Sequence, residues 1–260
     1  RGLPGRGLPG RGLPGRGLSG HGLPGRGLPG QGRMPCASRC ARRAPPLVAH
    51  PAAARQRPYF AINHLEGHAL SPRLVDDVAF PYLLLLVSGG HTQLLAVAGP
   101  GDYHRYGTTM DAAAGEACDK CAKAMGLGYP GGPAIEAAAK SGDAKAVALP
   151  RPLKGSIGCH FSFSGLKTAL VNRLSQLGGP EAAPIADLAA SLQDVIADCL
   201  ADRTKAALTR FREEFPHDDA NQPALVIAGG VAANQHIFAV LQRVTTDANF
   251  RLSVPPAKLC

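Results

Sequence analysis

The sequence predicts an α/β domain that begins near Tyr59 and follows a low-complexity segment. Strand-like and helix-like segments alternate with short connections after residue 59, and two of the strands end in paired glycines. The composition changes at the same point. Residues 1–58 contain eleven Arg and no Lys, Asp or Glu, whereas residues 59–260 contain 17 Lys and Arg against 19 Asp and Glu. The formal charge of +9 therefore belongs to the first segment, and the nearly neutral body gives no general reason to expect a nucleic-acid partner.

The first 32 residues repeat a five-residue unit, Arg-Gly-Leu-Pro-Gly, with small variations. The period differs from that of collagen, which requires Gly at every third position. Chains so rich in Gly and Pro bury too little apolar surface to offset their conformational entropy. We expect residues 1–58 to be disordered; an arginine-rich arm that binds RNA is the functional alternative. The pair Cys36 and Cys40 lacks the further ligands of a zinc site.

Several classes of protein are excluded by simple counts. Seven cysteines without a regular spacing argue against a disulfide-stabilised secreted scaffold. The N-terminus has no apolar stretch of the kind found in signal peptides. The longest apolar run, Tyr82–Val87, is far shorter than the roughly 20 residues that cross a bilayer. We therefore expect a soluble, cytoplasmic protein without a membrane partner.

The first half of the body alternates between strand and helix patterns. Tyr59–Asn63 is typical of the end of a buried strand, and a helix is predicted from His64. Apolar runs at Tyr82–Val87 and Thr92–Val97 predict two strands joined by a Ser-Gly-Gly-His turn. The Ala-rich residues 111–125 predict a helix, and the Gly- and Pro-rich residues 127–133 predict a loop.

The second half contains longer helical patterns. Residues 165–177 predict a helix that is opened by the segment Phe-Ser-Phe-Ser at 161–164. Apolar residues recur at helical spacing from residue 185 and predict a long amphipathic helix to about Phe215. A strand at 224–228, a helix at 231–244 and a last strand at 250–254 complete the domain.

Two histidines stand four residues apart in His64-Leu-Glu-Gly-His68. On a helix these imidazoles share a face and can hold one metal ion, although such a pair also occurs for structural reasons. The zinc metallopeptidase motif places Glu directly after the first His, where this chain has Leu65. A metallopeptidase is therefore only a third hypothesis.

Two strands end in glycine turns, at Leu86-Val-Ser-Gly-Gly90 and at Ala228-Gly-Gly-Val-Ala-Ala-Asn234. Glycine allows backbone N–H groups to approach a phosphate, and the second turn leads into a helix whose N-terminal amides favour anions. The two elements together predict a nucleotide site. Cys118-x-x-Cys121 has no second pair at zinc-ribbon spacing and no thioredoxin-like context, so we assign it no function.

Six motifs, taken in order, resemble those of the TsaD family, formerly labelled O-sialoglycoprotein endopeptidases. They are His64–His68, Val87–His91, Gly115–Lys120, Tyr129–Pro133, Phe161–Thr168 and Ala228–Asn234. The resemblance covers residues 59–260. It implies an actin/Hsp70/sugar-kinase-like fold built from ribonuclease-H-like halves, of which this chain holds one incomplete copy. It also implies transfer of a threonylcarbamoyl group from threonylcarbamoyl-AMP to N6 of adenosine 37 in tRNAs that read ANN codons.

The resemblance also assigns roles to residues. His64 and His68 would bind one divalent transition metal, with iron preferred over zinc. The turn formed by Leu86, Val87, Ser88, Gly89 and Gly90 would hold the phosphate and the threonylcarbamoyl end of the donor, and Asp119, Gly132, Glu136 and Asn234 would contact the rest of it. No side chain is expected to act as a nucleophile. The family acts on tRNA together with TsaB-type and TsaE-type subunits.

The chain departs from the family pattern at both ends. The family has a first half-domain before the histidine pair, where this chain has the repeat, and it continues after the last strand with a Thr-Asp-Asn segment whose Asp completes the metal shell. This chain stops at Cys260. We therefore expect a truncated transferase that is inactive as written; a non-catalytic remnant or interaction module is the alternative.

Overall fold

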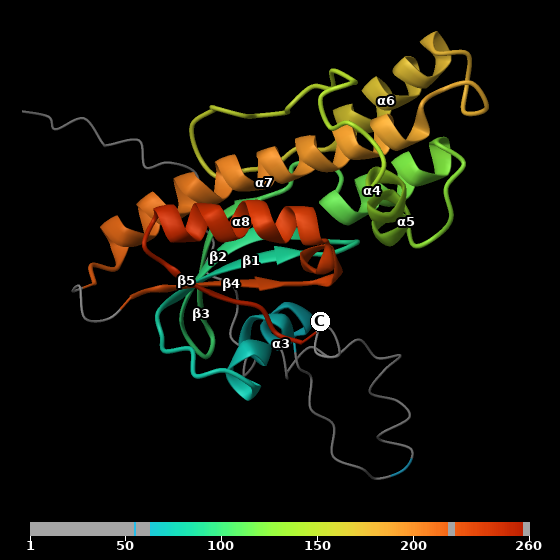
Figure 1. Ribbon diagram of the computed structural model, residues 1–260. Coiled ribbons are helices and arrows are strands. Elements are labelled where there is room, and N and C mark those ends of the chain that lie inside the picture. Colours follow the sequence, from blue (N-terminus) through green and yellow to red (C-terminus); the bar gives the residue numbers. More distant parts are fainter. Residues whose placement is uncertain (1–54, 56–62, 218–221, 257–260) are drawn as a thin grey trace, which may run out of the picture. The chain divides into compact units, whose positions relative to one another are not determined.

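The computed structural model describes residue 55 and residues 63–217 and 222–256 (Figure 1). The last two stretches lie in one compact unit that spans Gln31–Cys260. The predicted strand end at 59–62 lies outside the described residues. The predicted disorder concerns residues 1–58, which also lie outside the described residues apart from residue 55. The predicted domain boundary at Tyr59 lies outside them as well.

The unit is built on a five-stranded mixed sheet with the order β3-β2-β1-β4-β5. The strands are β1 Tyr82–Val87, β2 Thr92–Gly99, β3 Asp102–Thr108, β4 Ala224–Ala228 and β5 Arg251–Ser253. β1, β2 and β3 form an antiparallel meander, and β4 and β5 are added parallel to β1. This is the strand order of a ribonuclease-H-like half, so the predicted fold class is confirmed.

Side chains of β1 alternate between two apolar layers because successive residues of a strand point to opposite faces. Leu83, Leu85 and Val87 belong to the larger core, which also contains buried residues of the helices α4, α7 and α8. Leu84 and Leu86 belong to a smaller core, which includes Ala69 of α3. The sheet therefore has α7 and α8 on one face and α3 on the other (Figure 1). Both faces of β1 are covered, which explains its uninterrupted apolar sequence.

The helices account for most of the remaining described residues. They are α3 His64–Leu70, η1 Ser71–Leu74, α4 Ala114–Ala124, α5 Gly131–Ala139, α6 Ser164–Gln176, α7 Ile185–Glu214, η2 Gly230–Ala233 and α8 Gln235–Asp247. The long helix α7 packs against both α5 and α8. None of the helices in residues 63–217 and 222–256 combines the length and the apolar character that a membrane span requires.

Three predicted elements were wrong in their bounds or nature. The predicted helix 111–125 begins only at Ala114, whose N–H donates a hydrogen bond to the Thr92 hydroxyl. The predicted loop 127–133 ends at Gly131, where α5 begins; Pro133 is tolerated there because the first N–H groups of a helix have no intrahelical partner. The predicted helix 231–244 is divided at Asn234 into η2 and α8. The strand β3 was not predicted.

Candidate functional site

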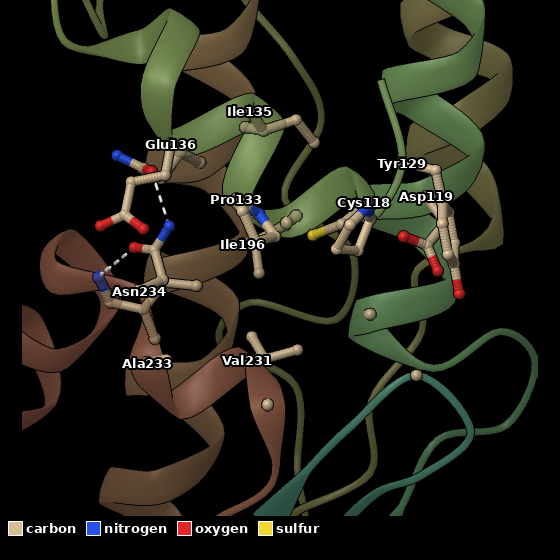
Figure 2. A pocket seen from close by; sticks show the side chains of 17 residues that line it. Cys118, Asp119, Tyr129, Pro133, Ile135, Glu136, Ile196, Val231, Ala233 and Asn234 are labelled. Carbon is tan, nitrogen blue, oxygen red and sulfur yellow. Dashed lines mark hydrogen bonds between the residues drawn. The ribbon is translucent and has the colours of Figure 1, made fainter. Parts of the chain in front are cut away.

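A cavity of about 330 Å³ opens where the ends of β1 and β4 meet the helices α4, α5, α7 and α8 (Figure 2). It is lined by Gly89, Gly115, Cys118, Asp119, Tyr129, Pro130, Gly132, Pro133, Ile135, Glu136, Gln193, Ile196, Gly230, Val231, Ala233, Asn234 and Ile237. Five predicted donor-binding residues are therefore brought together: Gly89, Asp119, Gly132, Glu136 and Asn234. We call this cavity the donor pocket.

The two glycine turns meet at the pocket because β1 and β4 are parallel neighbours. Leu86 pairs with Ala228, so both strands end at the same edge of the sheet. Gly229 has a φ of 101°, and a Cβ placed there would lie 2.3 Å from the carbonyl oxygen of Val87. The turn after β4 thus touches the end of β1 only because residue 229 is glycine.

The other four residues of the first turn do not line the pocket. Leu86 and Val87 are buried in opposite cores of the sheet, so they offer a ligand no more than their backbone. The Ser88 hydroxyl accepts a hydrogen bond from the N–H of His91 at 3.1 Å, and the Ser88 carbonyl accepts one from Gly115. Ser88 therefore holds the turn in shape and attaches it to the start of α4.

Asp119 joins α4 to the start of α5. Its Oδ1 accepts a hydrogen bond from the N–H of Gly131 at 2.8 Å. The two backbones are so close that a Cβ on Gly131 would lie 2.6 Å from the Cα of Asp119, whereas a Cβ on Gly132 would meet nothing within 4 Å. Of the two glycines, Gly131 permits the packing and Gly132 lines the pocket.

Glu136 and Asn234 lie at one end of the pocket, and Asp119 and Tyr129 lie at the other (Figure 2). The Oε1 of Glu136 accepts a hydrogen bond from the N–H of Gln235 at 2.7 Å. Asn234 accepts one from Ile237 through Oδ1 at 3.0 Å, and donates one through Nδ2 to Gln193 at 2.8 Å. Asn234 is thus both a helix cap and a pocket residue.

Gln193 was missed by sequence reasoning. It lies on α7 between the buried residues Leu192 and Val195, at the border of the apolar face. A polar residue at that border is also typical of a solvated helix, so periodicity alone gives no sign of a site. Only the fold shows that this position faces the start of α8.

The predicted metal ligands lie on α3. The ring centroids of His64 and His68 are 4.5 Å apart, and that of His91 is 6.2 Å from His64. Burial lowers the pKa of His68, and the nearby imidazoles of His64 and His91 lower it further, which favours the neutral form that binds metals. Within residues 63–217 and 222–256, no three His, Cys, Asp or Glu side chains are grouped so that they could hold an ion. The described part of the chain therefore supplies a pair of imidazoles, which fits two positions of a metal shell.

Cys118 and Cys121 are free thiols on α4. Burial raises the pKa of the Cys118 thiol to about 12 and that of Cys121 to about 11. Such thiols are poor nucleophiles near neutral pH. Both thiols are therefore buried in the core and protonated near neutral pH.

Comparisons with known proteins identify the family of this chain. A sequence model described as "tRNA N6-adenosine threonylcarbamoyltransferase", TsaD, matches residues 48–260. The chain is 58% identical over 205 residues to a protein of that name from Maricaulis maris, covering 78% of this chain and 54% of the relative. It is 54% identical over 209 residues to one from Brucella suis, covering 80% and 58%. The chain thus spans just over half the length of these curated relatives.

Among solved structures, the chain is similar to the activator of the 2-hydroxyisocaproyl-CoA dehydratase from Clostridium difficile with bound ADPNP. The sequence identity is 16%, the TM-score is 0.43, and the match covers 75% of this chain and 60% of that chain. That structural likeness is too weak to bear on function. The family model, in contrast, matches most of the chain, and the curated relatives are more than half identical to it. The chain therefore belongs to the TsaD family of tRNA N6-adenosine threonylcarbamoyltransferases.

Proposed function

We propose that this chain binds threonylcarbamoyl-AMP in the donor pocket and acts in the transfer of its threonylcarbamoyl group to N6 of adenosine 37 in tRNAs that read ANN codons. One observation carries the proposal. Gly89, Asp119, Gly132, Glu136 and Asn234, which come from four separate parts of the chain, line a single cavity. They stand at the positions that the family pattern assigns to the donor.

The chemistry of the pocket suits the adenosine part of an adenylate. Asp119 and Glu136 each accept a hydrogen bond from a backbone N–H through one carboxylate oxygen. The second oxygen of each remains available to accept one from a hydroxyl or amine of a ligand. Between the two ends lie the apolar residues Pro133, Ile135 and Ile196 (Figure 2). An apolar cavity with a few fixed polar groups is typical of small-molecule sites.

The phosphate and the threonylcarbamoyl group would extend from this cavity toward the first glycine turn. Gly89 lines the pocket, and His91, two residues further on, lies near His64. Backbone N–H groups of such a turn can stabilise charge that develops on the departing phosphate. The attacking amine of adenine is neutral and weak, so the carbonyl must be made electrophilic and the AMP leaving group held in line. The amine then forms the new bond to the carbamoyl carbon, AMP departs and N6 loses a proton to solvent, so that no protein nucleophile is needed.

We further propose that His64 and His68 hold one divalent transition metal, iron in preference to zinc. A metal bound there would polarise a carbonyl or phosphate oxygen of the donor as a Lewis acid. The contribution of the chain is to present two adjacent imidazoles on one helical turn. We also infer that TsaB-type and TsaE-type subunits assist the reaction, and that the protein acts in the cytoplasm.

Calorimetric titration of the chain with AMP and with threonylcarbamoyl-AMP tests the donor site. We expect both ligands to bind, and expect Asp119→Asn and Glu136→Gln each to weaken binding roughly 3- to 10-fold, the effect of one lost hydrogen bond. Glu181→Gln, at an exposed position outside the pocket, is the matched control. An intact, folded chain that binds neither ligand would refute the proposal.

A transfer assay separates the enzyme from a binding remnant. The chain is incubated with threonylcarbamoyl-AMP, metal, TsaB-type and TsaE-type subunits and unmodified tRNA, and the modified nucleoside is measured by mass spectrometry. A transferase gives repeated turnovers. Donor binding without any product would assign the chain to the alternative, a non-catalytic module.

Metal analysis tests the histidine pair. We expect the double variant His64→Ala/His68→Ala to lose most of the metal that the parent chain binds, and expect His160→Ala, an exposed histidine outside the pair, to keep it. Equal metal content in all three proteins would rule out His64 and His68 as ligands.

A further inference from the structure

The start of α8 is fixed by two side chains from two other helices. Glu136 of α5 accepts a hydrogen bond from the N–H of Gln235, and Gln193 of α7 accepts one from the Nδ2 of Asn234. Two consecutive residues are thus each held from outside their own helix.

Asn234 is the one of these two residues that lines the donor pocket. Its Oδ1 is committed to the N–H of Ile237, and one of its two Nδ2 hydrogens is committed to Gln193. The second Nδ2 hydrogen remains available to an acceptor on a ligand. The Asn234 amide would therefore donate a hydrogen bond to the ligand, and the orientation of this amide is already set before the ligand binds.

We propose that Gln193 is a positioning residue of the donor site, which acts by holding the Asn234 amide in its binding orientation. The proposal goes beyond the proposed function and rests on it, because it takes the pocket to be the donor site. Without the acceptor at position 193, the Asn234 side chain would be held at one end only, and binding would include the cost of ordering it. Gln193 itself lines the pocket, and its proposed effect on affinity passes through Asn234 rather than through a direct contact with the ligand.

Binding of AMP tests this role with three variants. Gln193→Met removes the acceptor at similar size, and we expect AMP to bind roughly 3- to 10-fold more weakly. Gln193→Glu keeps a side-chain oxygen acceptor, and we expect an affinity within about 2-fold of the parent chain. Gln176→Met, at an exposed position of α6 outside the pocket, is the control for loss of a glutamine.

A double variant shows whether the effect passes through Asn234. If it does, Gln193→Met adds no further loss of AMP affinity in an Asn234→Ala background. A loss of the same size in both backgrounds would overturn the proposal, since Gln193 would then act directly. An unchanged AMP affinity in Gln193→Met would also overturn it.

The side-chain amide signals of Asn234 give a readout without ligand. The chain has five asparagines, so selective ¹⁵N labelling gives few signals, and Asn234→Asp identifies the pair in question. We expect slow hydrogen exchange of the Asn234 Nδ2 group in the parent chain and in Gln193→Glu, and fast exchange in Gln193→Met. Unchanged exchange in Gln193→Met would refute the positioning role. A parent chain with slow exchange but no AMP binding would instead refute the proposed donor site, and with it the function of the ordered amide.

Discussion

The paired glycines of the pocket have unequal roles at the scale of single residues. Gly229 has a φ of 101° and leaves no space for a Cβ, whereas a Cβ on the adjacent Gly230 would meet nothing within 4 Å. The same contrast separates Gly131 from Gly132. In both pairs the first glycine permits a close approach of two backbones and the second one lines the pocket. A Gly-Gly sequence motif cannot reveal this division of roles, because both residues look alike in sequence.

Substitution of the two glycines after β4 tests this division. Gly229→Ala forces an L-residue into a left-handed conformation and against the Val87 carbonyl, which together cost about 2–6 kcal/mol. We expect the thermal midpoint to fall by roughly 4–24 °C. Gly230→Ala should shift it by less than about 2 °C, although it narrows the pocket. Thermal unfolding monitored by circular dichroism measures both, and equal shifts would contradict the assignment.

Asp111 is a second residue whose role depends on partners that are distant in sequence. It accepts hydrogen bonds from the hydroxyls of Ser162 and Ser164 and from the N–H groups of Phe163 and Ser164. Partial burial alone would raise the pKa of Asp111, but these hydrogen bonds lower it to about 2. The carboxylate thereby fixes the segment before α4 against the start of α6. Asp111 therefore lies before α4, although the Ala-rich sequence predicted that the helix begins at residue 111.

The depressed pKa gives a pH dependence with a definite sign. A carboxyl group whose pKa is lower in the folded state stabilises the fold above its unfolded pKa, and this stabilisation is lost as the pH falls from about 4 to about 2. We expect Asp111→Ala to lower the thermal midpoint by about 2–4 °C at pH 7, and expect the difference from the parent to vanish near pH 2. Glu181→Ala serves as the control. A difference that is independent of pH would show that the charge is unimportant.

At the scale of elements, residues 151–158 form a connection that is held against α7 by charged side chains, and we call it the strap. Arg151 contacts Asp194 and Asp198, and Lys154 also contacts Asp198. Arg151 and Lys154 are exposed and the two carboxylates are half-buried, whereas Arg203 is only 3% exposed. Arg203 donates hydrogen bonds to the carbonyls of Ser156 at 2.7 Å and Gly158 at 3.0 Å, and it also pairs with Asp202. The buried arginine therefore does most to fix the strap.

Two variants of the strap separate buried from exposed charge. Arg203→Met leaves two carbonyls and a carboxylate without their donor, which costs about 3–5 kcal/mol and lowers the thermal midpoint by roughly 6–20 °C. Arg151→Met removes two ion pairs at the surface, worth together about 1 kcal/mol, and we expect a shift of at most about 4 °C. Sodium chloride at about 0.5 M should diminish only the second effect, because buried pairs are screened weakly. A larger effect of Arg151→Met would contradict this ranking.

The elements also show how far the sequence could predict the structure. Tyr82–Val87, Ala224–Ala228 and the long helix α7 follow directly from apolar runs and helical periodicity. β3, with the sequence Asp-Tyr-His-Arg-Tyr-Gly-Thr, was missed because polar residues separate its two buried tyrosines, so it has no continuous apolar run. The break at Asn234 was missed because Val-Ala-Ala fits a helix, and only the capping bond to Ile237 shows where α8 begins.

The pocket was predictable in its residues but not in its connections. Family resemblance gave Asp119, Glu136 and Asn234, and the structure brings them to one cavity. Gln193 carries no motif, and its importance depends on the packing of α7 against α8. Contacts that are made across 41 residues of sequence cannot be deduced from local pattern. The same limit explains why His91 was not expected beside the histidine pair of α3.

At the scale of the whole molecule, the larger core joins elements from most of the described chain. Four buried cysteines belong to it: Cys118 and Cys121 on α4, Cys159 before α6, and Cys199 on α7. Burial raises the pKa of all four thiols, to about 12 for Cys118 and about 11 for Cys121 and Cys199. At pH 8 Cys118 is therefore almost entirely protonated. The thiols of this core therefore report on its opening from three separate parts of the chain.

Cys118 lines the donor pocket, so the prediction concerns the other three thiols. We predict that Cys121, Cys159 and Cys199 react with iodoacetamide at one common, slow rate in the native chain at pH 8. A single core opens cooperatively, so each of these thiols becomes reactive only when the whole core unfolds. Peptide mass spectrometry gives the rate at each position, and the chain unfolded in urea, in which all seven cysteines react, provides the reference. Addition of urea below the unfolding transition should accelerate all three by the same factor. A much faster rate at Cys121 than at Cys199 would contradict the prediction, because α4 would then open on its own. The donor pocket between α4 and α7 would in that case form and be lost without global unfolding.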